Sequence, residues 1–191
     1  MTAVAPSSDD LTLLATVKTY ITTGTQDDNL LQRLLTSASV FIENYLNRDL
    51  TTTSYTQTFD GSNNAVLYLP QYPVTAVTAV TINGVTIAAA SVTTPGFYFT
   101  PNAVILNGYR FVKGWGNITI SWTAGYGVAG NGIPQDLEQA CIGMVQYWLG
   151  DRQRNGEVSR SMGGQTISFT QKDMPPWVAT ILAQYKRVFS Q

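Results

Sequence analysis

The chain contains no histidine among its 191 residues and only one cysteine, Cys141. Histidine is the usual base that activates a serine or cysteine nucleophile, and it is a frequent zinc ligand. Its absence therefore excludes Ser-His and Cys-His catalysis and most zinc sites. Cys141 has no disulfide partner and no neighbouring base, so we expect it to fill space in the core. No enzyme activity and no cofactor are expected.

Charged residues are also scarce. They make up 12% of the chain, whereas about 25% is typical of soluble domains. Much of the surface must then consist of neutral polar side chains. Such a surface is found on proteins that pack against neighbours, but it equally suits a monomer with a threonine-rich sheet, and both interpretations stay open. The net charge of −1 gives no overall field that would hold a polyanion.

The charges that are present are unevenly distributed. Residues 1–70 hold seven acids and three basic residues, whereas residues 151–191 hold six basic residues and three acids. Head-to-tail contact between copies would use this asymmetry, although a solvated surface explains it more simply.

Long apolar runs are missing. No stretch approaches the roughly 18 apolar residues that a membrane-spanning helix needs, and the first ten residues lack the basic-then-apolar pattern of a signal peptide. We therefore expect a protein that is not secreted by the usual route and that contacts no membrane.

The strongest helix signal runs from Ile133 to Arg152. Pro134 suits a first helical position, and Asp136 and Glu138 place negative charge near the unpaired amides of the first turn. An apolar stripe at helical spacing requires a partner helix. The stripe consists of Leu137, Cys141, Met144 and Trp148, and Ala140 and Val145 widen it.

Three further helices are predicted. A short helix spans Leu11 to Ile21, and a capping box at residues 25–28 opens a second helix that continues to Leu46 and forms the best partner for the central one. The Pro175-Pro176 pair opens a last helix. Its predicted apolar face is Trp177, Ile181, Tyr185 and Val188, with Leu182 and Phe189 beside them.

Between these helices the sequence changes to short β-branched and alternating runs, with no acid between Gly61 and Gln135. Asn83-Gly84 between two such runs predicts a tight type I′ hairpin. Seven strands are predicted: 55–59, 66–69, 77–82, 85–87, 97–99, 104–106 and 118–123.

The predicted fold is therefore α+β, a bundle of about four helices with an inserted antiparallel β unit of six to seven short strands. Residues 1–51 and 133–191 form the bundle with its C-terminal arm and last helix, and residues 52–132 form the inserted domain. Glycines between residues 154 and 164 predict a mobile arm, and Gln165 to Thr170 alternates as a short strand.

Residues 125–130 match the G-x-G-x-x-G dinucleotide fingerprint. The context argues against it, because the helix begins only at Pro134 and the preceding strand alternates as a half-exposed strand does. A hydrolase would need Asp60 or Asp136, but both are typical of turns and helix starts. An aromatic platform for carbohydrate is the remaining alternative. Its residues would be Tyr98, Tyr109, Trp115, Trp122 and Tyr126.

Three blocks of the chain together resemble the head-tail connector, or adaptor, family of tailed bacteriophages. The first block is Leu14–Ile21 with Asp27–Arg48, the second is Gly114–Ile118 and Trp122–Tyr126 leading to Ile133–Ala140, and the third is Leu182–Arg187. The long β insertion departs from the smaller members of that family.

The resemblance implies a structural subunit of the virion neck that assembles in the host cytoplasm. It implies a ring, typically dodecameric, that binds under the portal protein, extends the channel for genomic DNA without sequence-specific contacts, and docks a stopper or tail-completion protein. The C-terminal segment would bind the portal, and the candidates are Trp177, Tyr185, Lys186 and Arg187. Channel or intersubunit candidates are Arg152, Arg154 and Arg160. The alternative function is a carbohydrate-binding or adsorption module of a phage tail or baseplate.

Overall fold

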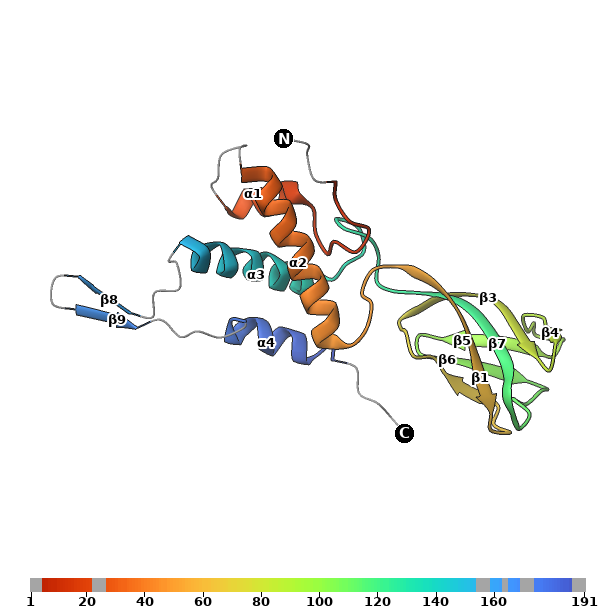
Figure 1. The fold of residues 1–191 in the computed structure, drawn as a ribbon. Helices are drawn as coiled ribbons and strands as arrows, with labels where there is room; N and C mark the ends of the chain where they lie inside the picture. Colours follow the sequence, from red (N-terminus) through yellow and green to blue (C-terminus); the bar gives the residue numbers. More distant parts are fainter. Residues whose placement is uncertain (1–4, 22–26, 154–158, 163–164, 169–173, 187–191) are drawn as a thin grey trace. The chain divides into compact units, whose positions relative to one another are not determined.

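A computed structural model describes residues 5–21, 27–153, 159–162, 165–168 and 174–186. The chain divides into two compact units: Met1–Leu50 with Val128–Gln191, and Thr51–Gly127. The first unit is helical and the second is built of antiparallel strands (Figure 1). The predicted α+β class is confirmed.

The helical unit contains α1 (Leu14–Tyr20), α2 (Asp28–Leu46), α3 (Gln135–Gln153) and α4 (Pro176–Ala183). The first helix begins three residues later than predicted because Leu11 contacts the rest of the unit instead. Its side chain is fully buried, and its backbone N–H donates to Ser39 Oγ at 3.0 Å. No described helix is long and apolar enough to cross a membrane.

The predicted capping box of α2 is not what begins that helix. Asp27 is the N-cap residue, and its side chain makes no capping hydrogen bond; Thr25 lies outside the described residues. At the other end, Asn47 adopts the left-handed conformation, with φ of 55°, and its backbone N–H donates to the carbonyl groups of Glu43 and Asn44. Asparagine tolerates this conformation better than most residues, so the stop signal of α2 is local.

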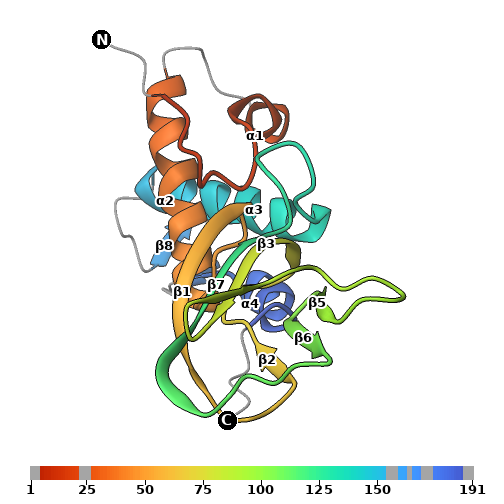
Figure 2. The same cartoon turned by 90° about the vertical axis from the view of Figure 1, so that its right-hand side faces the viewer.

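Helix α3 lies at the centre of the unit and crosses α2 (Figure 2). The prediction of one apolar stripe was too narrow, because the five consecutive residues 141–145 are all buried. A helix that is buried all round must have partners on several sides. On one side Cys141 Sγ lies 3.6 Å from Ser39 Oγ of α2, and on another Gly143 is covered by α4.

Asp10 ties the segment before α1 to α2. Its carboxylate is 1% exposed and accepts hydrogen bonds from the backbone N–H of Ser7 (2.9 Å), Gln32 Nε2 (2.7 Å) and Thr36 Oγ1 (2.8 Å). We expect Asp10→Asn to lower the free energy of unfolding by about 1–2 kcal/mol, because the amide replaces one accepting oxygen by a donor that faces donors. Urea denaturation checks this value; Asp9→Asn, at an exposed position, is the control and should leave stability within about 0.5 kcal/mol.

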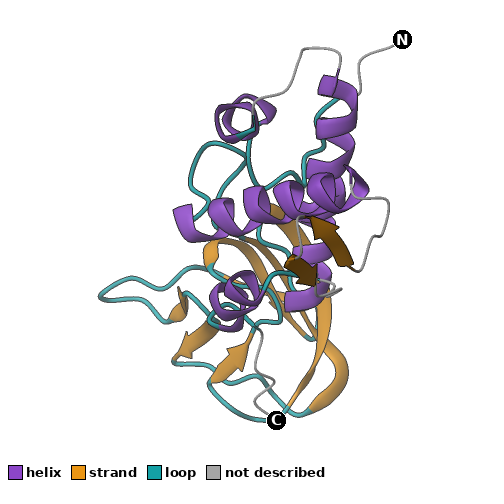
Figure 3. Cartoon of the chain, turned by 90° about the vertical axis from the view of Figure 1, so that its left-hand side faces the viewer, coloured by secondary structure: helices purple, strands orange, loops and turns teal. Residues whose placement is uncertain are grey.

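The segment predicted as a mobile arm includes a strand. Residues Ser159–Met162 form β8, which pairs antiparallel with β9 (Gln165–Ser168). It is the one strand pair of the helical unit within the part that the structure describes (Figure 3). The strand Gln165 to Thr170 was predicted correctly in place, although its last two residues lie outside the described part.

All seven predicted strands of the second unit are present. The four-stranded sheet has the order β1-β7-β3-β4 and the three-stranded sheet the order β2-β6-β5, with every neighbouring pair antiparallel. The turn between β3 and β4 has positive φ at both Asn83 (51°) and Gly84 (79°), as a type I′ hairpin requires. The strands are β1 (Thr53–Gly61), β2 (Val66–Tyr68), β3 (Val74–Ile82), β4 (Val85–Ile87), β5 (Gly96–Thr100), β6 (Ala103–Asn107) and β7 (Gly114–Ala124).

The core of the β unit is one apolar cluster that draws on both sheets. Along β7 the burial alternates: Ile118, Ile120 and Trp122 are buried, and Thr119 and Ser121 between them are half-buried. Trp122 is the largest fully buried side chain among the described residues. It stacks on Tyr55 of β1, with ring centroids 5.4 Å apart, and the tilted ring of Phe59 lies 6.0 Å away.

Candidate functional site

Helix α4 carries the first of the candidate docking residues. The face it buries is Val178 and Leu182, both fully inaccessible, and not the predicted stripe that began at Trp177. Trp177 is 48% exposed, and its ring lies over Gly143 of α3, where an added Cβ would overlap the indole. Gly143 therefore makes room for the ring, which gives Trp177 a structural role within the unit.

Tyr185 and Lys186 follow α4 and also contact their own helical unit. The Tyr185 hydroxyl donates to Asp136 Oδ2 at 2.7 Å, and Lys186 Nζ lies 5.2 Å from the centroid of the Tyr45 ring. A cation above an aromatic face is attracted to it. The two residues thus join the segment directly after α4 to α3 and α2. Arg187 lies outside the described residues.

The three arginine candidates are placed unequally by the structure. Arg152 is exposed in the last turn of α3. The backbone of Arg160 pairs with Ile167 in the β8–β9 hairpin. Arg154 lies outside the described residues.

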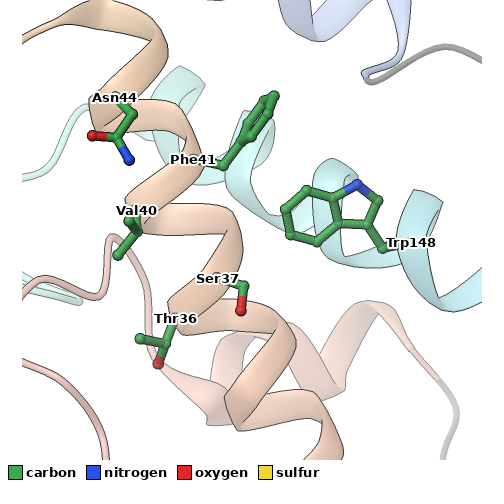
Figure 4. Close-up of a pocket in the computed structure, with 6 residues that line it drawn as sticks. All are labelled: Thr36, Ser37, Val40, Phe41, Asn44 and Trp148. Atoms are coloured by element: carbon green, nitrogen blue, oxygen red, sulfur yellow. The ribbon is translucent and has the colours of Figure 1, made fainter.

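One concave surface of the helical unit was not predicted. A pocket of about 410 Å³ opens between α2 and α3. Phe41 of α2 and Trp148 of α3 point toward one another there, with ring centroids 5.7 Å apart and ring planes at 80° (Figure 4). Val40, which is 42% exposed, also lines the pocket. The lining residues are Thr36, Ser37, Val40, Phe41, Asn44 and Trp148; we call this surface the α2–α3 face.

No charged residue lines the α2–α3 face. The sequence held a signal for it: residues 34–42 of α2 and residues 139–150 of α3 contain no charged side chain in any direction. Amphipathic helices on a solvated surface normally carry charges opposite their apolar face. Two charge-free stretches that meet in space therefore mark a surface that differs from an ordinary solvated one.

The acidic residues considered for hydrolysis have structural contacts. The Asp60 carboxylate in the β unit accepts a hydrogen bond from the backbone N–H of Gly116, and Asp136 in the helical unit accepts the one from Tyr185. Burial raises the pKa of the Cys141 thiol to about 12, so the thiol stays protonated and unreactive near neutral pH. Within the described ranges no three acids or cysteines gather as metal ligands.

The aromatic residues of the β unit do not form one platform. Trp122 is 1% exposed and belongs to the core, so its proposed part in carbohydrate binding is wrong. Trp115 is 93% exposed, and Tyr98 and Tyr109 are about half exposed. The alternation of β7 already placed Trp122 with Ile118 and Ile120 on the buried face.

With this geometry in view, comparison with known protein families gives a match to the head completion protein family over residues 10–188. The chain belongs to this family. The match includes both units and all described helices and strands. Membership assigns the protein a structural part in virion assembly and not an enzymatic one. No curated protein sequence matches the chain.

Solved structures with the same fold come from gene transfer agent particles. The head completion protein aligns over its full length with 96% of a chain in the neck of a native particle computed with C12 symmetry, with a TM-score of 0.64 and 17% identity. It aligns equally completely with chains from the neck of an empty particle computed with C6 symmetry (TM-score 0.62, 20% identity) and from the native virion (0.61, 20%).

Proposed function

We propose that this head completion protein is a connector subunit of a virion neck. Copies form a ring of twelve subunits that lies under the portal protein. The ring extends the channel through which the genome passes, and it binds a stopper or tail-completion protein. Genomic DNA passes through the ring without sequence-specific contacts.

The observation that carries the proposal is the agreement between family and fold. The family match covers residues 10–188, and the whole chain shares its fold with neck proteins of particles whose necks were computed with C12 and C6 symmetry. Rings of this kind are closed by heterologous contacts, in which one surface of a subunit meets a different surface of the next.

The C-terminal candidates for portal docking remain Trp177, Tyr185, Lys186 and Arg187. The exposed half of the Trp177 ring offers an aromatic contact of the kind enriched at protein interfaces. The contacts of Tyr185 and Lys186 with Asp136 and Tyr45 restrict these two side chains, which lowers the entropic cost of docking through them. Arg152, Arg154 and Arg160 are proposed to face the channel or the neighbouring copy.

Negative-stain imaging of the purified protein, alone and mixed with the portal protein of the same particle, tests the proposal. We expect rings that stack on the portal along a shared axis. Gold-labelled antibody against the chain should bind at the neck of intact particles. Particles that contain no copy of the chain, or that carry it only at the distal end of the tail, would contradict the proposal.

A further inference from the structure

We propose that the α2–α3 face, formed by Thr36, Ser37, Val40, Phe41, Asn44 and Trp148, is the lateral surface through which one copy contacts the next copy of the same chain. The inference rests on the proposed ring and adds to it the surface that closes the ring.

The α2–α3 face has the residue composition of a protein interface. Its apolar lining residues are the aromatic pair Phe41 and Trp148, and Val40, which is 42% exposed. Thr36, Val40 and Asn44 follow one another at four-residue spacing, so they extend the contact along one side of α2 (Figure 4). Aromatic residues are enriched at the cores of protein interfaces, and charged residues are depleted there.

Apart from Asn44, the residues that form the α2–α3 face lie on helix stretches that contain no charged residue. These stretches are residues 34–42 and 139–150. A surface that binds DNA needs lysine or arginine to neutralise phosphates, so nucleic acid does not fit this face. A permanent interface between copies does fit, because obligate homomeric interfaces resemble a protein core more closely than transient ones do.

The two sides of α2 differ in how much surface they leave free for contact with a neighbouring copy. The opposite side of α2 is used within the subunit, where Leu31, Leu35, Ala38 and Ile42 are fully buried. The pocket side of α2 is accessible, and α3 contributes Trp148 to it from the end of the helix. The α2–α3 face therefore combines two helices that are already fixed by the core, so that docking a neighbour orders little of the chain and costs little entropy.

The single buried cysteine makes a direct test possible. Cys141 is fully buried and its pKa is raised to about 12, so maleimide reagents at neutral pH will not modify it. A cysteine introduced by Val40→Cys becomes the one reactive thiol. The matched control is Val66→Cys in β2 of the other unit, where the valine is 37% exposed compared with 42% for Val40.

Labelling would be compared between the free chain and purified particles that contain the variant. We expect assembly to slow maleimide labelling of the cysteine at position 40 by at least about tenfold, since opening of the interface would then limit the reaction. Labelling at position 66 is expected to change far less. Equal labelling rates at position 40 in the free chain and in particles would overturn the inference.

Cross-linking identifies the partner. Benzophenone-maleimide attached to the cysteine at position 40 and illuminated in particles should give an adduct of twice the 20.8 kDa chain mass. An adduct with a chain of another mass would assign the face to a different partner and overturn the inference. Particles that lack the chain altogether would instead contradict the proposed connector function, so the two failures are distinguishable.

Discussion

Trp122→Ala is expected to lower the free energy of unfolding of the β unit by about 3–5 kcal/mol, the range for removal of a large aromatic side chain from a core. Trp122 is 1% exposed, and it is the largest of the fully buried side chains. Its ring stacks on Tyr55 and lies against Phe59, so its loss also leaves two half-buried aromatics without their contact. Equilibrium urea denaturation, followed by near-ultraviolet circular dichroism, measures the effect.

Because of the indole N–H of Trp122, we expect a second variant to lose less stability than Trp122→Ala. The Trp122 indole N–H is buried and has no hydrogen-bond partner among the residues that the structure describes. Trp122→Phe removes this unsatisfied donor while it keeps an aromatic ring, and we expect it to cost less than half of the alanine variant, because the desolvation penalty of the N–H is relieved.

Trp115→Ala is the matched control, because Trp115 lies in the same strand and is 93% exposed. It should change stability by no more than about 0.5 kcal/mol. If Trp115→Ala were as destabilising as Trp122→Ala, the assignment of core and surface along β7 would be wrong.

The β unit was the part of the fold that the sequence predicted best. Its signals are local: alternation places Ile118 and Ile120 on one face, and Asn83-Gly84 can supply the two positive φ angles of a tight turn. Each strand is therefore recognisable without knowledge of its neighbours. The strand order β1-β7-β3-β4 was not predicted, because pairing between distant segments leaves no periodic signal in any one of them.

The helical unit was predicted less completely, for a physical reason. An apolar stripe indicates one buried face, whereas α3 is covered on several sides, and the additional cover comes from α4, about 35 residues further along the chain. In α4 itself, the stripes that begin at Trp177 and at Val178 are adjacent on a helix of eight residues, and only packing against α3 selects Val178 and Leu182. Strand β8 was missed because its residues show no alternation of apolar and polar side chains. It is recognised as a strand only by its pairing with β9.

The candidate site was also predicted only in part. The resemblance directed attention to the C-terminal residues, and the structure shows that Tyr185 and Lys186 have partners within the subunit. The α2–α3 face needs two helices that are about 100 residues apart in sequence, so its pocket is visible only after folding. Its sequence signal, the absence of charge from residues 34–42 and 139–150, becomes meaningful once these two stretches are known to meet.

Gly143→Leu is expected to lower the free energy of unfolding of the helical unit by about 3–5 kcal/mol. Even a Cβ at this position would overlap the Trp177 ring, so a larger side chain forces α4 away from α3. Separation of these helices exposes Val178 and Leu182, which are fully buried, and each contributes roughly 1.5–3 kcal/mol by its burial. Thermal and urea denaturation of the full chain measure the loss.

A double-mutant cycle separates this clash from other effects of the substitution. In the Trp177→Ala background the ring that opposes residue 143 is gone, and we expect Gly143→Ala to become neutral or to stabilise by up to about 1 kcal/mol, since alanine favours a helix over glycine. In the native background the same Gly143→Ala change should destabilise, because overpacking outweighs that gain. Equal effects in both backgrounds would mean that Trp177 does not lie over α3. A coupling of about 1–3 kcal/mol would show that Trp177 holds α4 in place. The stability of each Trp177 variant must then be measured beside its binding to the portal. A loss of binding that is caused by unfolding assigns no docking contact to the ring.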